Sequence, residues 1–490
     1  MMTGPTGAST ASEFTTHHPA TGELFATYPV TSDQQMNEIV TRARTSAKWW
    51  AALSFSERRK ILLKWNSRLI TNLAEAVALI VAESGKPESD ATLEASLACE
   101  HVDWAAQKAH LYLREHHRSP GLLMANMSAR VDRVPYGVVG VIGPWNYPIF
   151  TPMGSIAYAL AAGNSVIFKP SEFTPGIGLW LAKTMREVVP DHDLLQVVTG
   201  AGAVGASLIA HGVDKISFTG STATAKKVAA ACVEKMIPFV LECGGKDPVL
   251  IDSDADLKRA ADHTLWSGMA NAGQSCIGAE RVYVHEQVAE RFIEILKGKA
   301  AEIKAGVNYG AATRPAQIDI IKRHVDDALN HGASVIGDRS SVGQRFVDPV
   351  IITNVPEDSP SMREETFGPV LIVNTVRNMD EAIAKANDTS FGLAASVWSK
   401  RNGEKIAAQL HCGMVSINSV FTFAAIASMP FGGVKDSGMG RIHGPEGLLE
   451  FTYPRSVVKP RFHLPLEFTS FKRNAFADKV ITTLGRIRHK

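Results

Sequence analysis

The chain has 490 residues, of which 45% are hydrophobic and 20% are charged, and its formal net charge is +2. This length and composition predict a globular protein of about three domains and exclude a disordered or fibrous chain. The nearly balanced charge excludes the basic footprint that is typical of a nucleic-acid-binding protein.

Five cysteines are spread along the chain, an odd number without a C-x-x-C pair. This usage argues against a disulfide framework and against a zinc site, so we expect no metal and a reducing, cytoplasmic location. The first fifteen or so residues lack the basic start and apolar core of a signal peptide, and we expect them to form a frayed terminus.

From Ser32 to His116, helix-forming residues combine with apolar residues at three- and four-residue spacing. The run Ser54-Phe55-Ser56-Glu57 resembles a helix start. We therefore expect this region to form helices that cover a domain.

Between Val138 and Phe218, short β-like runs alternate with helical runs. The strand candidates are Val138 to Ile142, Ser165 to Phe168, Leu195 to Val198 and Lys215 to Phe218, and helices are expected over Met153 to Ala162 and Gly178 to Val188. Strands of four or five residues flanked by helices predict a doubly wound parallel sheet. Such sheets bind ligands beyond the carboxyl ends of their strands.

Three loops follow these strands and carry polar residues: Pro144 to Pro148, Lys169 to Glu172, and Thr219 to Thr222. A lysine and a glutamate directly after a strand can hold ribose hydroxyls, and a Gly-Ser turn that opens a helix can bind a phosphate through backbone N–H groups. The G-x-G-x-x-G fingerprint of ordinary dinucleotide-binding folds is absent.

A second α/β pattern follows residue 246 and predicts another domain. Its strand candidates are Pro248 to Ile251, Arg281 to Val284, Val370 to Val373 and Val397 to Trp398, with a helix over Val288 to Ile303. Two further strand-like segments, around Val131 and at Ser456 to Val458, have no obvious partner nearby in the sequence. They can pair with each other or with another subunit.

The last residues, Phe468 to Lys490, mix Phe, Ile and Leu with Lys and Arg, as a basic amphipathic segment does. One hypothesis is a peripheral contact with an anionic membrane. The alternative is a solvated, disordered tail, and the sequence leaves both open.

The octet Asn271 to Gly278 surrounds Cys276 with small residues that leave room around its sulfur. A reactive thiol is one interpretation. A buried structural cysteine is the other, since free cysteines are usually packed in protein cores. The surrounding motifs decide between the two.

Seven motifs occur in one order along the chain: PWNYP from Pro144, KPSE from Lys169, FTGST from Phe218, ECGGK from Glu242, GQSC ending at Cys276, EETFGPV from Glu364, and PFGGVKDSGMGR from Pro430. Together they resemble the aldehyde dehydrogenase superfamily, and the resemblance runs from about Thr16 to Phe462. It implies an α/β fold with two doubly wound domains and a small β oligomerisation arm, and hence a homodimer or homotetramer.

The resemblance also implies a division of the chain. The implied parts are an NAD-binding domain of residues 1–115 and 136–246, a catalytic domain of residues 247–453, an arm of residues 116–135 and 454–466, and a basic tail of residues 467–490. The two isolated strand-like segments fall within the arm.

Three catalytic residues follow from the resemblance. Cys276 attacks the aldehyde carbon, and the side-chain amide of Asn146, together with the backbone N–H of the cysteine, stabilises the oxyanion. Glu242 activates the water that hydrolyses the resulting thioester. Family members that pass the acyl group to coenzyme A typically lack this carboxylate, so we expect hydrolysis to a free acid.

A bound NAD(P) is implied as well. The matching cofactor positions are Trp145, Lys169, Ser171, Glu172, Gly220, Ser221, Glu365 and Phe367. The carboxylate of Glu172 would repel the 2′-phosphate of NADP by about 1 to 4 kcal/mol in a partly solvated site, so we expect NAD to be preferred.

The substrate positions are Ile277, which follows the nucleophile, Phe421 and Phe423, which match the substrate-entry loop, and Gly154, where many relatives place a bulky aromatic residue. No arginine occurs in these stretches to pair with a substrate carboxylate. We therefore expect an apolar, fairly open tunnel for long-chain, aromatic or terpenoid-like aldehydes. Family branches that act on carotenoid-derived or aryl aldehydes are the nearest resemblance.

Two other functions are alternatives. A cysteine hydrolase without a cofactor needs a histidine base, and the chain has sixteen histidines. A non-catalytic binding or structural protein is also possible, because folds are reused. The cofactor loops argue against the first alternative, and the intact set of Asn146, Glu242 and Cys276 argues against the second.

Overall fold

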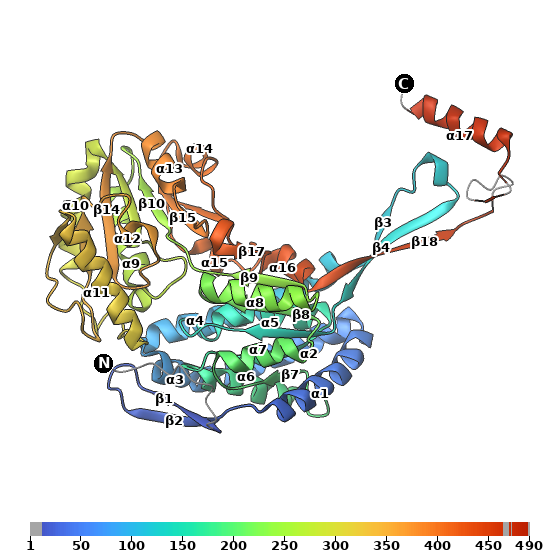
Figure 1. The fold of residues 1–490 in the computed structure, drawn as a ribbon, viewed down its shortest axis with the longest axis horizontal. Helices are drawn as coiled ribbons and strands as arrows, with labels where there is room; N and C mark the ends of the chain where they lie inside the picture. Colours follow the sequence, from blue (N-terminus) through green and yellow to red (C-terminus); the bar gives the residue numbers. More distant parts are fainter. Residues whose placement is uncertain (1–11, 464–469, 472, 489–490) are drawn as a thin grey trace.

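Two α/β bodies and a projecting β arm make up the structure (Figure 1). The computed structural model describes residues 12–463, 470–471 and 473–488. Each body is built on a largely parallel sheet, so the predicted fold class is confirmed.

The prediction of a frayed start falls mostly on residues 1–11, which lie outside the described residues. It is wrong for the residues from Glu13 onward. These form strand β1 (Glu13–His17), which pairs antiparallel with β2 (Leu24–Pro29).

The first sheet has six strands in the order β17-β9-β8-β5-β6-β7. These strands are β5 (Val138–Ile142), β6 (Ser165–Lys169), β7 (Leu195–Val197), β8 (Lys215–Thr219), β9 (Phe239–Glu242) and β17 (Gly438–Met439). Strands β5 to β8 confirm the four predictions, and β9 is additional. From β5 the sheet grows outward through β6 and β7, whereas β8 and β9 lie on its other side. The switch point between β5 and β8 is where such sheets bind ligands.

Helices cover both faces of this sheet. They are α1 (Asp33–Ala52), α2 (Phe55–Thr71), α3 (Leu73–Ser84), α4 (Glu88–Leu113), α5 (Phe150–Ala162), α6 (Pro175–Val188), α7 (Gly202–Ala210) and α8 (Thr222–Glu234). The predicted helix start is confirmed, because Ser54 and Glu57 form a capping box at α2. Apolar side chains of α2 to α6 form one core cluster. A second cluster contains the apolar side chains of α7 and α8 and most of those on the apolar face of α1.

The second sheet has seven strands in the order β12-β13-β14-β11-β10-β15-β16. These strands are β10 (Pro248–Ile251), β11 (Arg281–His285), β12 (Ser334–Ile336), β13 (Val350–Thr353), β14 (Val370–Val376), β15 (Ala394–Trp398) and β16 (Met414–Ile417). All neighbours are parallel except β12 and β13. The four predicted strands are confirmed, and β12, β13 and β16 are additional to them.

The helices of the second body lie between these strands. They are α9 (Leu257–Met269), α10 (Glu286–Ala300), α11 (Pro315–Asn330), α12 (Pro360–Arg363), α13 (Met379–Asn387), α14 (Gly403–Ala407) and α15 (Thr422–Ala425). The predicted helix over Val288 to Ile303 corresponds to α10, which begins and ends slightly earlier.

The arm is a three-stranded antiparallel sheet of β3 (His116–Arg118), β4 (Met127–Pro135) and β18 (Thr452–Pro460). Ser456 lies opposite Val131, so the two isolated segments pair with each other within one chain. The 3₁₀ helix η1 (Leu122–Met124) lies between β3 and β4, and helix α17 (Ala475–Arg488) follows the arm (Figure 1). In the described part of the chain, no helix is long and apolar enough to cross a membrane.

The end of the predicted catalytic domain at residue 453 differs from the strand pairing. Strand β17 and helix α16 (Gly444–Glu450) fall within the predicted range 247–453. However, β17 pairs with β9, and α16 packs against α4 and α5 of the first body. The chain thus returns to the first sheet beside Glu242, the last residue of β9, which lies opposite Gly438.

Candidate active site

Cys276 is carried by a tightly folded loop that follows α9. Asn271, Ala272 and Gly273 all have positive φ values, and a side chain at Gly273 would overlap the backbone of Gly368. A Cβ atom at Gly245 would lie only 2.9 Å from the carbonyl oxygen of Cys276. The glycine turn after β9 therefore packs directly against the cysteine loop.

Asn146 links the loop after β5 to the cysteine loop. Its side-chain Nδ2 donates a hydrogen bond to the carbonyl oxygen of Gln274 (2.9 Å), and its own carbonyl oxygen accepts one from Asn271 Nδ2 (3.0 Å). An amide nitrogen carries two hydrogens, so one N–H of Asn146 is left to donate to another acceptor. The structure thus brings Asn146 to the loop that carries Cys276.

A buried ion pair holds the Asn146 loop, and the sequence offered no pattern that could identify it. Lys86 Nζ pairs with Glu94 and donates to the carbonyl oxygen of Asn146 (2.8 Å). The same Glu94 accepts hydrogen bonds from the backbone N–H groups of Ile149 (3.0 Å) and Phe150 (3.3 Å). Both charged side chains are almost completely buried. The pair therefore anchors both sides of the loop that presents the amide of Asn146.

We expect Lys86→Met to lower the free energy of unfolding by about 3 to 5 kcal/mol, because Glu94 is left as a buried carboxylate without its partner. The double variant Lys86→Met/Glu94→Gln should recover part of this loss, since it buries no charge. Urea unfolding followed by circular dichroism measures both. Equal stability of Lys86→Met and the unmodified protein would contradict the anchoring role.

Glu242 ends β9 with its carboxyl group buried, and neither carboxyl oxygen has a hydrogen-bond partner among the described residues. Burial raises its pKa well above the ordinary value, although Arg441 lowers it in part and Glu450 raises it further. A Cβ atom at Gly432 would lie 2.7 Å from one of its oxygens, so the carboxyl group lies against the loop before β17. A buried, unpaired carboxyl group with a raised pKa is suited to accept and release a proton.

The thiol of Cys276 has a raised pKa. Burial is the largest cause, and the carboxyl groups of Glu365, Asp247 and Glu242 raise it further, while a hydrogen bond from the cysteine backbone lowers it. The electrostatic effect of Glu242 indicates that the predicted base lies near the predicted nucleophile. The thiol is thus protonated at neutral pH and has to lose its proton before it can attack.

Glu365 lies on the glycine turn beside Cys276. It accepts a hydrogen bond from the N–H of Gly245 (3.2 Å), and a side chain at Gly244 would overlap its carboxyl group. Burial, with the charge of Glu280, raises the pKa of Glu365 to about 8. Only glycine at position 244 leaves this carboxyl group in place.

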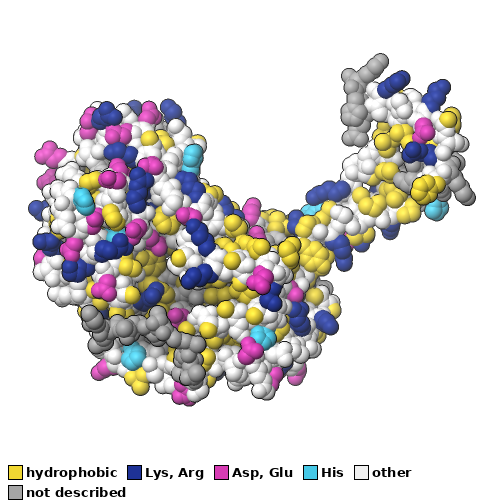
Figure 2. Space-filling view, viewed as in Figure 1, with side chains coloured by type: hydrophobic (Ala, Val, Ile, Leu, Met, Phe, Trp, Pro, Cys, Tyr) yellow, Lys and Arg dark blue, Asp and Glu magenta, His cyan; other side chains and the backbone are white. Residues whose placement is uncertain are grey.

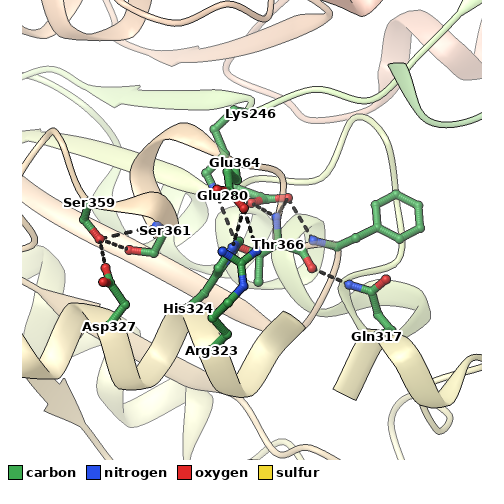
Figure 3. A network of polar contacts seen from close by, with 11 residues as sticks. Lys246, Glu280, Gln317, Arg323, His324, Asp327, Ser359, Ser361, Glu364 and Thr366 are labelled. Atoms are coloured by element: carbon green, nitrogen blue, oxygen red, sulfur yellow. Dashed lines mark hydrogen bonds and ion pairs between the residues drawn. The ribbon is translucent and has the colours of Figure 1, made fainter. Parts of the chain in front are cut away.

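A second buried ion pair, Lys246 with Glu280, holds the loop of Glu365 and Phe367 (Figure 3). Glu280 accepts hydrogen bonds from the backbone N–H groups of Thr366 (2.9 Å) and Phe367 (3.2 Å). Lys246 donates to the hydroxyl group of Thr366 (3.0 Å), which also bonds His324 (3.0 Å). This network holds the backbone of Phe367, which has a positive φ of 52°.

The predicted ribose-binding residues lie together after β6. Lys169 Nζ donates to the carbonyl oxygen of Pro170 (3.0 Å) and lies 3.7 Å from the carboxylate of Glu172. The hydroxyl group of Ser171 lies 3.4 Å from the same carboxylate. The side chain of Glu172 is 38% exposed, so it can meet a ligand at the edge of the sheet.

Gly220 and Ser221 lie where β8 ends and α8 begins. The N–H of Gly220 donates to the carbonyl oxygen of Glu242 (3.0 Å), and the hydroxyl group of Ser221 accepts from Thr224 in the first turn of α8. The start of this 13-residue helix offers N–H groups that suit a pyrophosphate. Together with the partly exposed carboxylate of Glu172, the start of α8 fits a nicotinamide dinucleotide.

Trp145 and Phe367 meet edge to face, with ring centroids 5.5 Å apart. The guanidinium group of Arg314 lies 5.8 Å from the ring of Trp145 and 5.0 Å from that of Phe173. Among the described residues its Nε atom has no hydrogen-bond partner. Arg314 is therefore a candidate for an anionic part of the cofactor, and no motif in the sequence indicated it.

The predicted substrate residues divide into two groups. Ile277 and Cys276 pack against one apolar cluster, which includes Phe423 and Phe431. Phe421 instead lies beside Trp266, with ring centroids 5.2 Å apart. A groove of about 540 Å³ runs past this tryptophan, and its lining is partly polar: Asp90, Asp262, His263, Leu265, Trp266, Met269, Ala270, Lys299, Glu302, Ile303, Asn308, Tyr309 and Val420.

The prediction of an open tunnel is wrong at Gly154. Gly154 is buried in the middle of α5, and a side chain there would overlap the imidazole ring of His443. His443 is buried; its ring stacks on that of Tyr158 and contacts the rings of His101 and Phe431 at a tilt. The place of an aromatic residue on α5 is thus taken by a histidine from another part of the chain.

Comparison with known proteins places the chain in one family. The model of the aldehyde dehydrogenase family matches residues 6–457. The 4,4′-diapolycopene aldehyde oxidase of Methylomonas sp is 37% identical over 466 residues, which cover 93% of this chain and 88% of the relative. A Mycolicibacterium smegmatis protein, provisionally named as an NADP(+) succinate-semialdehyde dehydrogenase, is 36% identical over 453 residues, which cover 90% and 87%.

Solved structures agree with this result. The NAD-dependent aldehyde dehydrogenase from Sinorhizobium meliloti matches with a TM-score of 0.89 and 30% identity, covering 94% of this chain and 93% of that one. The NADP-dependent glyceraldehyde-3-phosphate dehydrogenase from Bacillus halodurans, complexed with NADP, matches with a TM-score of 0.87 and 30% identity, covering 92% and 97%. The chain, with Cys276, Asn146 and Glu242 gathered at its candidate site, therefore belongs to the aldehyde dehydrogenase family.

Proposed function

We propose that this aldehyde dehydrogenase oxidises an apolar aldehyde to the free carboxylic acid, with NAD as its preferred cofactor. The observation that carries the proposal is the hydrogen bond from Asn146 to the cysteine loop. This bond supports a role for the amide of Asn146 as a donor to the oxyanion that would form when the sulfur of Cys276 attacks a carbonyl carbon. Each such donor contributes about 3 kcal/mol to stabilising the transition state.

The cofactor is held by residues from both bodies in this proposal. Lys169 and Glu172 hold the adenine ribose, Ser221 and the start of α8 hold the pyrophosphate, and Glu365 with Phe367 holds the nicotinamide ribose and ring. When bound, an oxidised nicotinamide accepts the hydride that leaves the thiohemiacetal on Cys276. The buried Lys246–Glu280 pair keeps the Glu365 loop in place for this contact.

Hydrolysis is assigned to Glu242. After hydride loss the acyl group remains on Cys276 as a thioester, and its release needs a water molecule that loses a proton. The carboxyl oxygens of Glu242 have no partner among the described residues, so they are available to take that proton.

An apolar substrate is favoured by the side chains near the thiol, because Cys276 and Ile277 pack against an apolar cluster. The groove beside Trp266 carries Asp90, Asp262 and Glu302, and its lysine, Lys299, is paired with Asp262 (2.8 Å). A substrate with a second carboxylate would meet like charges there. The Methylomonas relative is named for an apolar aldehyde and the mycobacterial one for a semialdehyde, so relatives support both classes.

The preference for NAD rests on the carboxylate of Glu172. NADP is the alternative, for two reasons. Lys169 lies 3.7 Å from Glu172 and offsets part of its charge, and Arg314 adds a cation at the neighbouring Phe173. In addition, NADP appears in the names of the mycobacterial relative and of the Bacillus halodurans structure.

A panel of aldehydes with both cofactors tests the proposal. We expect kcat/KM for decanal and benzaldehyde to exceed that for succinic semialdehyde and betaine aldehyde by at least about tenfold. The carboxylate of succinic semialdehyde would meet the acids of the groove, and the cation of betaine aldehyde, next to its carbonyl carbon, would be buried against the apolar cluster around Cys276 and Ile277. NAD should be preferred to NADP by about 1 to 4 kcal/mol. Higher kcat/KM values for the charged aldehydes would overturn the substrate class, and a preference for NADP would overturn the role of Glu172.

Other expectations stay predictions: a homodimer or homotetramer, a cytoplasmic location, and the peripheral membrane contact of the basic tail. A cysteine hydrolase is disfavoured, because no described histidine forms a hydrogen bond with Cys276. The aldehyde panel also distinguishes the dehydrogenase from a cysteine hydrolase and from a non-catalytic protein, since neither of these two would reduce NAD.

A further inference from the structure

Arg314 reaches from the second body to aromatic side chains of the first. It is the last residue before helix α11. Its guanidinium group lies 5.0 Å from the ring centroid of Phe173 and 5.8 Å from that of Trp145, and both rings belong to the first body. Trp145 in turn meets Phe367 of the second body edge to face. The cation therefore lies where side chains from both bodies converge.

Within the described part of the chain this cation has no anionic partner. The guanidinium group of Arg314 takes part in no ion pair or hydrogen bond with the described residues, and its Nε atom is buried. Aromatic rings attract a cation through their faces but do not accept its N–H groups in the way that oxygen atoms do. The donors of an arginine form a planar fork that matches the oxygen atoms of a phosphate. The group is thus positioned with its donors unused.

The backbone on both sides of Arg314 is held by hydrogen bonds. Before it, the N–H of Thr313 donates to the side-chain oxygen of Gln274 in the cysteine loop (2.9 Å). After it, the side-chain amide of Gln317 donates to the carbonyl oxygen of Thr366 (Figure 3). Arg314 is therefore fixed between the cysteine loop and the network shown in Figure 3.

The overall charge of the chain gives little attraction for a dinucleotide. The net charge is only +2. Figure 2 shows Lys and Arg interspersed with Asp and Glu over the visible face of the second body, without a broad field of one sign. Binding of a phosphate group then relies on individual cations that lie at the cofactor itself. An unpaired arginine between the two bodies is such a cation.

We propose that Arg314 binds the pyrophosphate of the nicotinamide dinucleotide. The inference rests on the proposed function, which places the adenine ribose at Glu172 and the nicotinamide ring at Phe367. Arg314 lies over Phe173, the residue after Glu172. It also lies over Trp145, which contacts Phe367. The cation is thus placed between the two ends of the cofactor, and the pyrophosphate is the anionic group that joins these ends. Its N–H groups add a second contact to the one assigned to the start of α8.

The 2′-phosphate of NADP is the other anionic group to consider, since it adjoins the adenine ribose. The position over Trp145 as well as Phe173 favours the pyrophosphate, because Trp145 belongs to the nicotinamide end. The two assignments predict different results. A contact with the pyrophosphate strengthens the binding of NAD and NADP equally, whereas a contact with the 2′-phosphate strengthens the binding of NADP alone.

Isothermal titration calorimetry of the full-length protein tests this proposal. The ligands are NAD, NADP, ADP-ribose, which keeps the pyrophosphate but lacks the nicotinamide, and adenosine, which lacks both. We expect Arg314→Gln to weaken the binding of NAD, NADP and ADP-ribose by about 10- to 100-fold, the scale of hydrogen bonds to a charged group. The affinity for adenosine should not change. Arg314→Lys keeps the charge but not the fork, so its loss should be smaller.

The matched control is Arg339→Gln, which removes an exposed arginine from the same body and should bind every ligand like the unmodified protein. Unchanged binding of ADP-ribose by Arg314→Gln would overturn the assignment and leave the proposed function intact. A loss confined to NADP would also overturn it, in favour of the 2′-phosphate. An equal loss for adenosine would contradict a specific contact with phosphate. If the unmodified protein bound neither NAD nor NADP, the proposed function would fail together with this inference.

Discussion

Cys276→Ala is expected to reduce aldehyde-dependent NADH formation by at least about 10⁴-fold, the scale of losses seen when a covalent nucleophile is removed. An aldehyde carbonyl is a poor hydride donor, and the sulfur converts it into a tetrahedral adduct that is a good one. The amide of Asn146 bonds to the loop that carries this sulfur, and Glu365 lies on the glycine turn that packs against the same loop. They cannot act on a carbonyl that has not been attacked.

Absorbance of the reduced nicotinamide measures this effect directly. Cys412→Ala is the matched control, because Cys412 is another partly buried cysteine in the same chain whose thiol only donates to the carbonyl oxygen of Met414. It should retain nearly full activity. Steady turnover by Cys276→Ala would contradict the covalent mechanism.

Glu242→Gln is expected to form about one NADH per subunit in a burst and then to turn over about 10² to 10⁴ times more slowly than the unmodified protein. Glutamine keeps the size of the side chain but cannot accept a proton. The acyl group should therefore form on Cys276 and remain there. Stopped-flow absorbance resolves the burst from the slow phase.

The pH dependence of acyl release from Cys276 is a second test of the role of Glu242. Burial raises its pKa, so the carboxylate form that acts as a base becomes more abundant as the pH rises through this raised value. The release rate of the unmodified enzyme should rise over the same range, and that rise should be absent in Glu242→Gln. Glu446→Gln, at an exposed glutamate of α16, is the control and should show neither a burst nor a changed pH profile.

Most of the parallel strands could be predicted because each is a short apolar run between helices, and burial on both faces demands that pattern. The strands that were not predicted lack this pattern. Strand β9 is four residues long and merges with the glycine turn that follows it, and β17 has only two residues. The pairing of Val131 with Ser456 could be considered but not decided, because an isolated strand gives no information about its partner.

The chemical motifs identified the residues of the candidate site. The buried ion pair that holds the loop of Asn146 in place could not be predicted from them. Lys86 and Glu94 are single charged residues within helical sequence, and only the folded chain brings them under Asn146. Gly154 is the clearest error. A small residue suggests an open pocket when its own position is considered, whereas the packed structure fills the space with His443 from a distant segment.

The mass of Glu242→Gln after brief mixing with benzaldehyde and NAD is the most direct test of the central claim. The claim is that this chain oxidises an aldehyde while it is covalently bound to Cys276. We expect a protein heavier by the mass of the aldehyde minus two hydrogens, with the added group on the peptide that contains Cys276. NADH formation without any acyl group on Cys276, or with the group on another residue, would contradict it.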